Sequence, residues 1–305
     1  MNLHSYFAPA SAFLLFASFL LLFTACKTET KINPQPPTAE REVTDDLGRK
    51  VKIPVKIDRI VSLAPNLTEN IFAVGAGNKL VGVTTYCNYP QETKEITKIG
   101  DTINPNLERI IALKPNVVFV STASQIEAFT KSLEQQNIAV FVTNPNNIEG
   151  VYKSLNQIGD IVGETEKANL LVEGLKKRVA DVESRTKSTT PVKVFVQISK
   201  EQLFTIGKAS FMTDLIDRAG GVSVTANIAE AYPKFSKETA LALQPEAIIL
   251  SESDDNREPN DVFKNSPAVK NGKVFKISAD LISRPGPRIV DGLEQIAKAL
   301  HPENF

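Results

Sequence analysis

Apolar residues follow two different spacings along most of the chain. Short, fully apolar runs such as Val117 to Val120 are typical of strands buried on both faces of a parallel sheet. Between such runs, segments 66–74 and 124–136 carry apolar residues at helical spacing. Strands and helices that alternate in this way predict an α/β fold built from Rossmann-like layers.

One segment in the middle of the chain differs from this alternation. Residues 165–186 are highly charged and have no proline, and their apolar residues form one narrow helical stripe made of Ala168, Leu171, Leu175, Val179 and Val182. A helix of this length is about 33 Å long, at roughly 1.5 Å per residue. A helix so long and polar is better suited to join two lobes than to lie in a core. We therefore predict an N-terminal lobe at 43–163, an interlobe helix at 164–187 and a C-terminal lobe at 188–305.

An internal repeat supports two similar lobes. Residues 106–121 and 236–251 match at a constant offset of 130, including Glu108 with Glu238 and Pro115 with Pro245. Each copy reads as a capping residue, a short helix, a proline stop and a buried strand. One such unit could agree by chance. Two copies on either side of a long helix are better explained by a repeated lobe.

The N-terminus indicates export. Residues 1–25 have no Asp, Glu, Lys or Arg and contain an apolar run too short to span a bilayer, which is typical of a signal peptide. The run ends in small residues before Cys26, as in a lipoprotein processing site, although Phe23 stands where Leu is usual. The alternative is an ordinary secretory signal followed by a chance cysteine. Residues 26–42 are polar and proline-rich and predict an extended tether, and a strand–turn–strand unit follows over 43–54.

Composition then excludes several classes of function. The 35 basic and 35 acidic residues balance, so there is no electrostatic footprint for nucleic acid. After processing, Cys87 is the one thiol available within the body and His301 the one histidine, and His301 reads as a surface residue near the C-terminus. No triad, zinc cluster, phosphate loop or dinucleotide fingerprint is visible, so we expect no enzyme activity and no resident metal or cofactor.

Aromatic residues in predicted loops at strand ends are candidates for ligand contact. Tyr86, Phe204 and Tyr232 lie in such loops, where open α/β sheets bind their ligands, although packing at a hinge would explain them equally well. Arg284 and Arg288 flank Pro285-Gly286-Pro287, and either can meet an anionic ligand group or pair with a carboxylate.

Several motifs together resemble the cobalamin and iron-siderophore periplasmic binding proteins, over roughly residues 43–300. They are Ser62-Leu63-Ala64-Pro65-Asn66-Leu67-Thr68-Glu69, Thr84-Thr85-Tyr86-Cys87-Asn88-Tyr89-Pro90, Asn106-Leu107-Glu108-Arg109-Ile110 and Arg284-Pro285-Gly286-Pro287-Arg288. The resemblance implies two Rossmann-like lobes joined by one long helix, with a ligand held between them. It also implies delivery to the permease and ATPase of an ABC importer in the inner membrane.

The resemblance assigns roles to individual residues. It implies that Glu108 and Glu238 dock onto the permease, whereas by themselves they would read as dipole-favoured carboxylates at helix starts. It further implies ligand contacts from a set of five residues, namely Tyr86, Phe204, Tyr232, Asp280 and Arg284.

The identity of the ligand stays open at this point. The aromatic positions favour cobalamin, but Thr102 and Ser121 stand where cobalamin binders have tryptophans, so ferric siderophores and haem remain alternatives. A soft metal contact by Cys87 is possible in principle, and a buried inert thiol is the simpler reading. We expect a monomer in the periplasm or on the outer face of the cell membrane, held by a lipid at Cys26. A periplasmic enzyme and a structural lipoprotein are the alternatives from other classes.

Overall fold

The computed structural model describes residues 39–121 and 127–305. The predicted signal segment 1–25, the predicted lipid site Cys26 and most of the predicted tether lie outside the described residues. In the part of the chain that is described, no helix combines the length and the apolar character needed to cross a bilayer.

The described chain opens with a two-stranded hairpin. Strands β1 (Glu40–Thr44) and β2 (Lys50–Pro54) pair antiparallel, and the Asp45 carboxylate closes the turn by accepting hydrogen bonds from the N–H groups of Leu47 and Arg49. The predicted start at residue 43 was three residues late, so the end of the predicted tether, 40–42, is strand. The polar side chains of that segment hide the strand in the sequence, because alternate residues of β1 face solvent.

A parallel sheet with the order β4-β3-β5-β6 forms the N-terminal lobe. Its strands are β3 (Ile60–Ser62), β4 (Leu80–Val83), β5 (Val117–Ser121) and β6 (Ala139–Thr143). Its helices are α1 (Pro65–Ala73), α2 (Leu107–Ala112), α3 (Glu127–Glu134) and α4 (Ile148–Val162). The fully apolar run of β5 is buried at every residue, as expected for a strand with helices on both faces. The predicted helix at 124–136 is α3, and the first residues of that prediction lie outside the described range.

The second parallel sheet, in the C-terminal lobe, has the order β10-β9-β7-β8. Its strands are β7 (Val192–Gln197), β8 (Gly221–Ser223), β9 (Ala247–Glu252) and β10 (Val274–Ser278). Its helices are α6 (Phe211–Arg218), α7 (Lys237–Ala242), α8 (Pro267–Lys270), α9 (Ala279–Ile282) and α10 (Ile289–Leu300). Short 3-10 turns complete the connections in both lobes.

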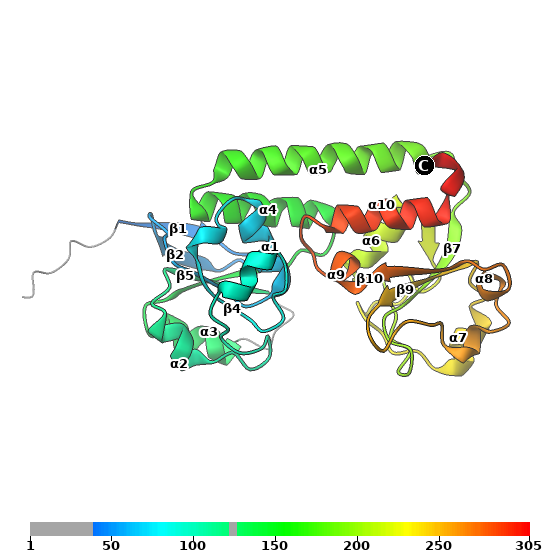
Figure 1. Cartoon of the computed structure of the whole chain (residues 1–305), viewed down its shortest axis with the longest axis horizontal. Helices are drawn as coiled ribbons and strands as arrows, with labels where there is room; N and C mark the ends of the chain where they lie inside the picture. Colours follow the sequence, from blue (N-terminus) through cyan, green and yellow to red (C-terminus); the bar gives the residue numbers. More distant parts are fainter. Residues whose placement is uncertain (1–38, 122–126) are drawn as a thin grey trace, which may run out of the picture. The chain divides into compact units, whose positions relative to one another are not determined.

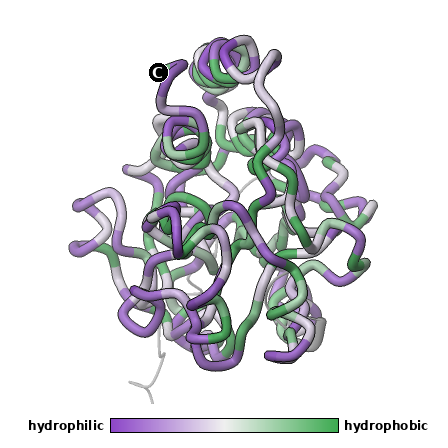
Figure 2. The backbone as a smooth tube through the Cα atoms, turned by 90° about the vertical axis from the view of Figure 1, so that its right-hand side faces the viewer, coloured by the Kyte–Doolittle hydropathy of each residue, from purple (hydrophilic) through white to green (hydrophobic). Residues whose placement is uncertain are grey.

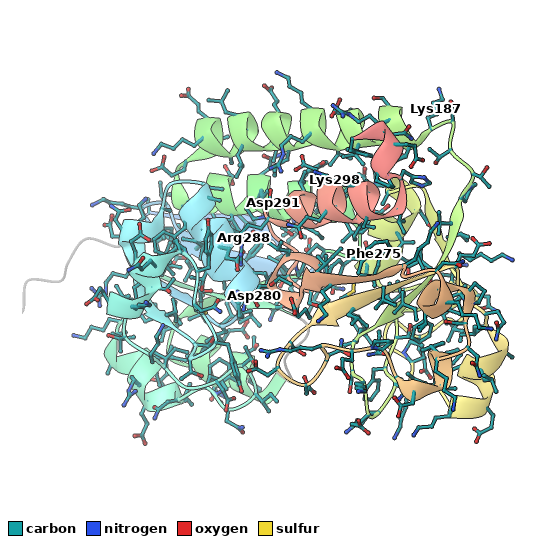
Figure 3. The ribbon with its side chains drawn as sticks, turned by 45° about the vertical axis from the view of Figure 1, so that its right-hand side comes forward. Lys187, Phe275, Asp280, Arg288, Asp291 and Lys298 are labelled. Carbon is teal, nitrogen blue, oxygen red and sulfur yellow. The ribbon has the colours of Figure 1, made fainter. Side chains whose placement is uncertain are left out.

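The long helix expected in mid-chain is α5 (Thr165–Thr186). It packs on α4 of the N-terminal lobe and on α10 and α6 of the C-terminal lobe, and Figure 1 shows it running along both. Gly159 lets α4 approach closely, because a Cβ there would lie 2.3 Å from the Cβ of Ala168 on α5. On the other side, Arg178 of α5 forms an ion pair with Asp291 of α10, which Figure 3 labels on that helix.

The internal repeat is visible in the geometry. Counted within each lobe, both sheets have the strand order 2-1-3-4, so β3, β4, β5 and β6 correspond to β7, β8, β9 and β10. Asn106 caps α2 by accepting from Arg109 N–H, and Ser236 caps α7 by accepting from Thr239 N–H. After each helix the backbone turns through a left-handed residue, Lys114 (φ 46°) and Gln244 (φ 42°), again 130 residues apart.

Three apolar clusters hold the body together. One runs from the α4 face of the first sheet through α5 to the α10 face of the second, and the other two fill the opposite face of each sheet. In Figure 2, hydrophobic residues gather inside, and hydrophilic residues lie on the loops and on the outer faces of the helices. The prediction for His301 was wrong, because the residue is 4% exposed and its Nε2 lies 3.0 Å from the carbonyl oxygen of Gly220. The chain turns inward at the C-terminal end of α10 and buries His301. The spacing of apolar residues in the sequence does not predict this turn.

The left-handed residues of the repeat give a test of backbone strain. We expect Lys114→Gly and Gln244→Gly each to raise the free energy of unfolding by about 0.5 kcal/mol, because a side chain in this region costs more than the added freedom of the unfolded glycine. The measurement is urea-induced unfolding followed by circular dichroism. The matched control is Lys177→Gly on the exposed face of α5, which should lower the same free energy by about 1 kcal/mol. Equal losses in all three variants would contradict the prediction.

Candidate functional site

A cleft of about 500 Å³ lies between the two lobes. The N-terminal lobe lines it with the turn after β3, the loop before α2, the end of β5 and the loop after β6, through Ala64, Pro65, Asn66, Thr102, Ser121, Asn144, Pro145 and Asn146. The C-terminal lobe contributes the start of α6, the loop after β8 and the loop after α9, through Ala209, Phe211, Ala231, Tyr232, Ser283, Arg284 and Pro285. These segments follow the carboxyl ends of strands in both sheets, where α/β sheets hold their ligands.

The structure brings two of the five predicted ligand residues into the cleft lining. Tyr232 and Arg284 line the cleft, whereas Tyr86, Phe204 and Asp280 are not part of its wall. Tyr86 is 58% exposed, and Phe204 forms an isolated β-bridge to Lys234. Whether any of the five contacts a ligand stays a prediction.

Thr102 and Ser121, which the resemblance matched to tryptophan positions of cobalamin binders, do line the cleft. Sequence reasoning missed Phe211 and Asn66 as lining residues. The signal for both was present, because each stands in the first turn of the helix that follows the first strand of its lobe.

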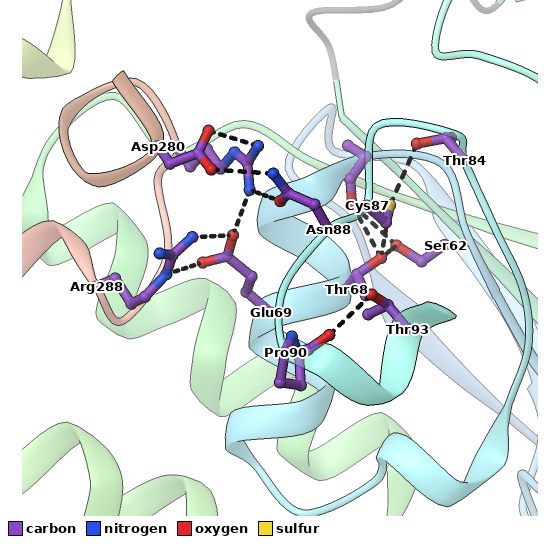
Figure 4. A network of polar contacts seen from close by, with 12 residues as sticks. Ser62, Thr68, Glu69, Thr84, Cys87, Asn88, Pro90, Thr93, Asp280 and Arg288 are labelled. Carbon is purple, nitrogen blue, oxygen red and sulfur yellow. Dashed lines mark hydrogen bonds and ion pairs between the residues drawn. The ribbon is translucent and has the colours of Figure 1, made fainter. Parts of the chain in front are cut away.

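A buried carboxylate joins the lobes beside the cleft. The Glu69 side chain on α1 is 2% exposed, and its Oε1 lies 2.9 Å from Nη1 of Arg284 and 2.7 Å from Nη2 of Arg288. The Arg288 Nε donates to Oε2 of the same carboxylate at 2.8 Å, and these hydrogen bonds raise the pKa of Arg288. Figure 4 shows Glu69 facing these partners from the other lobe. The sequence left open whether both arginines pair with carboxylates, and both do.

Further contacts extend this joint. Asp280 pairs with Arg284 at 2.6 Å, so two of the predicted ligand residues bind each other. Asn88 of the N-terminal lobe donates to Asp280 and accepts from Arg284, and the Arg288 guanidinium lies 4.0 Å from the centre of the Tyr89 ring. Figure 3 places Asp280 and Arg288 where the C-terminal lobe meets the first lobe.

A second ionic joint connects α4, α5 and α6. Arg218 of α6 binds Glu149 of α4 at 2.7 Å, Asp214 of its own helix at 2.9 Å, and also Glu183 of α5. Asp214 in turn accepts a hydrogen bond from the N–H of Ile148, in the first turn of α4. The lobes are therefore fixed to each other at two points besides the shared helix.

Cys87 is a buried thiol in the N-terminal lobe. Its Sγ lies 3.1 Å from the Thr68 hydroxyl and 3.2 Å from the Thr84 hydroxyl, and the side chain is away from the cleft lining. In residues 39–121 and 127–305, no three His, Cys, Asp or Glu side chains gather in a way that could hold a metal ion.

Glu108 and Glu238 occupy equivalent places in the two lobes. Each is exposed in the first turn of a short helix, α2 or α7, two residues after the capping residue. The backbone N–H of Glu238 and the Ser236 hydroxyl lower the pKa of the Glu238 carboxyl, so it stays ionised at neutral pH. In Figure 1, α2 and α7 both lie on the side of their sheets away from α5.

Comparisons with known proteins agree with this geometry. The chain is 32% identical over 272 residues to an uncharacterized ABC transporter substrate-binding lipoprotein of Bacillus subtilis (strain 168), covering 86% of each chain. Among solved structures it resembles the periplasmic vitamin B12 binding protein of Vibrio cholerae, with a TM-score of 0.73 and 26% identity over 82% of this chain and 98% of that one. It also resembles a periplasmic haem-binding protein of Pseudomonas aeruginosa, with a TM-score of 0.72 and 25% identity over 81% and 93%.

The family assignment rests on most of the body. The sequence profile described as "Periplasmic binding protein" matches residues 60–281, which run from β3 through α9 and include both sheets and α5. The chain therefore belongs to the periplasmic binding protein family.

Proposed function

We propose that this chain is the substrate-binding component of an ABC importer, which captures a metal chelate, cobalamin or another corrinoid, and delivers it to the permease and ATPase. The observation that carries the proposal is the cleft between two lobes of equal strand order, lined by loops from the carboxyl ends of both sheets. The relatives named as substrate-binding and vitamin B12-binding proteins support it. Such a protein binds its substrate and performs no chemistry on it.

The charge of the cleft favours an uncharged chelate over haem or an anionic siderophore. Among the described residues of the lining, Arg284 is the only charged one, and Glu69 and Asp280 neutralise it. Haem carries two propionates, and many ferric siderophores carry net negative charge, so unpaired cations in the wall would favour either of them. The rest of the lining is neutral amide, hydroxyl and aromatic, which suits a corrin with its carboxamide edge.

The state of Tyr232 supports the same choice. Tyr232 is 46% exposed; partial burial raises the pKa of its hydroxyl, and a hydrogen bond with Ser210 lowers it. The neutral ring with Phe211 beside it in the lining offers an apolar face for a flat macrocycle.

The exposed pair Glu108 and Glu238 suits docking to a two-fold permease. The carboxylates stand at equivalent positions of two lobes with the same topology, so the pair can meet two equivalent cationic sites. Export with a lipid at Cys26, followed by a short tether, would hold this monomeric receptor at the outer face of the membrane. A relative named as a lipoprotein supports the anchor.

Ligand choice can be measured by equilibrium dialysis of the purified body against cobalamin, haemin and a ferric siderophore. We expect saturable one-to-one binding of cobalamin without turnover, and weaker binding of the two anionic chelates. Tight binding of haemin with none of cobalamin would move the assignment to haem, and binding of none of the three would refute the proposal.

Alanine substitutions can distinguish the aromatic residues that line the cleft from the candidate aromatic residues outside its wall. Tyr232→Ala and Phe211→Ala should each weaken cobalamin binding about tenfold or more, because each removes an aromatic face from the cleft. Tyr86→Ala and Phe204→Ala are the controls and should change the dissociation constant little. The opposite order would show that the ligand lies at the sequence-predicted positions rather than in this cleft.

Docking is tested by reversing both charges, in Glu108→Lys together with Glu238→Lys. Uptake by the reconstituted importer should fall at least tenfold, because two ion pairs to the permease become repulsions, while cobalamin affinity stays unchanged. The control is Glu166→Lys, which changes an exposed first-turn glutamate on α5. Normal uptake by the double variant would rule out the docking role.

A further inference from the structure

The charged groups of the joint beside the cleft are balanced, and they come from both lobes. Arg284 and Arg288 belong to the C-terminal lobe, and so does Asp280, which pairs with Arg284 at 2.6 Å. The second carboxylate is Glu69 on α1 of the N-terminal lobe, and its Oε1 lies 2.9 Å from one guanidinium group and 2.7 Å from the other. Two cations therefore face two anions in this joint, and the opposite lobe supplies one of the anions.

Arg284 meets the N-terminal lobe through one nitrogen of its guanidinium. Nη1 donates to Glu69 Oε1 at 2.9 Å and to Asn88 Oδ1 at 2.7 Å, so both of its hydrogens are taken by that lobe. Figure 4 shows Glu69 and Asn88 side by side at this joint. Arg284 lines the cleft, yet these donors point at protein acceptors and Asp280 binds Nη2. A ligand carboxylate is best bound by a free pair of guanidinium N–H groups, which an arginine held in this way does not offer.

Gly286 allows the two lobes to approach this closely. The loop 284–288 lies on α1, and a Cβ at Gly286 would stand 3.0 Å from Asn70 Oδ1 and 4.0 Å from Glu69 Oε2. The Glu69 side chain is 2% exposed, so the surrounding solvent screens its charge only weakly. The negative charge of Glu69 therefore acts on the neighbouring wall of the cleft.

We propose that Glu69 is a positioning residue that sets the charge class of the ligand, although it does not itself line the cleft. By holding Nη1 of Arg284 and cancelling its charge, the carboxylate makes the cleft favourable for a neutral chelate and unfavourable for an anionic one. The neutrality of the wall is then a property of the contact between the lobes, since one of the two balancing carboxylates comes from α1. The inference rests on the proposed capture of a chelate in this cleft.

Three variants separate the charge of Glu69 from its contact. Glu69→Gln leaves two arginines against one carboxylate, so the joint gains one net positive charge. Glu69→Gln together with Arg288→Gln removes the same contact but restores the balance, because one arginine then faces one carboxylate. Glu149→Gln is the matched control. It removes a glutamate that binds an arginine of the other lobe, Arg218, at the second ionic joint, and neither residue lines the cleft.

Affinities for cobalamin and haemin are measured by calorimetry, and melting temperatures by scanning fluorimetry. We expect Glu69→Gln to raise the affinity for haemin relative to cobalamin about tenfold, because an unbalanced positive charge beside the cleft attracts a propionate. The double variant should return to the preference of the unchanged protein, and Glu149→Gln should keep that preference, whatever their melting temperatures. An unchanged ratio in Glu69→Gln, or a double variant as altered as the single one, would overturn the inference.

A small anion tests the same inference without a chelate. The Arg284 Nε–H resonance is titrated with inorganic sulfate, and Glu69→Gln should show a saturable response that the unchanged protein and the double variant lack. If the unchanged protein binds haemin and not cobalamin, the proposed ligand choice fails, and tighter haemin binding by Glu69→Gln still supports the role of Glu69. If it binds neither chelate, the proposed function fails, and the sulfate response alone decides the inference.

Arg288→Gln tests the balance from the other side and replaces Glu69→Gln if that variant does not fold. It leaves two carboxylates against Arg284, so the joint gains one net negative charge while Glu69 keeps a partner. The affinity for haemin relative to cobalamin should then fall about tenfold. A ratio equal to that of the unchanged protein would contradict the role of Glu69.

Discussion

The arrangement of the two lobes depends on one buried carboxylate. Glu69 has almost no exposure to solvent, and its charge is balanced by Arg284 and Arg288 from the other lobe. Removing one partner from a buried ion pair typically costs about 3–5 kcal/mol, because an uncompensated charge remains in a dry site. Opening the lobes at this point would expose or strand that charge. The loop 284–288 also forms part of the cleft wall, so the contact that fixes the lobes fixes the shape of the binding site as well.

The contact of Glu69 with Arg284 and Arg288 acts together with two other connections between the lobes. α5 packs on helices of both lobes, and Arg218 ties α6 to α4 and α5. Three connections leave little freedom for a wide hinge motion, so the cleft is largely formed before a ligand arrives. A preformed site loses less conformational entropy on binding, which favours affinity over adaptability. Selectivity must then come from the groups that already line the wall, their neutral charge above all.

Sequence patterns predicted the elements that depend on interactions between residues close together in the chain. The apolar stripe of 165–186 predicted the long helix that is α5, and the offset of 130 predicted two similar lobes, whose sheets do have the same strand order. The capping side chains of Asn106 and Ser236 were readable for the same reason, since each acts three residues away. The partners of Glu69 lie more than 200 residues away, and no periodicity reports such a pair. The residues alone therefore left open whether Arg284 meets a ligand or a carboxylate, and the structure shows its guanidinium bound to Glu69 and Asp280. His301 was placed on the surface because burial of a terminal residue depends on how the last helix ends.

The repeat is preserved where the lobes face outward and is broken where they face the cleft. Outside, α2 and α7 keep a capping residue and a glutamate at the same positions, which places one exposed carboxylate at the equivalent point of each lobe. Inside, the equivalent helices α1 and α6 differ. One begins with Pro65 and Asn66 and has no cap, whereas the other begins with Phe211 behind the cap of Ser210. The two walls of the cleft therefore differ, and Phe211 and Tyr232 supply aromatic rings from the C-terminal lobe. The likeness of the two lobes therefore lies in their strand order and in the outer helix starts, and the difference that shapes the cleft lies in the starts of α1 and α6.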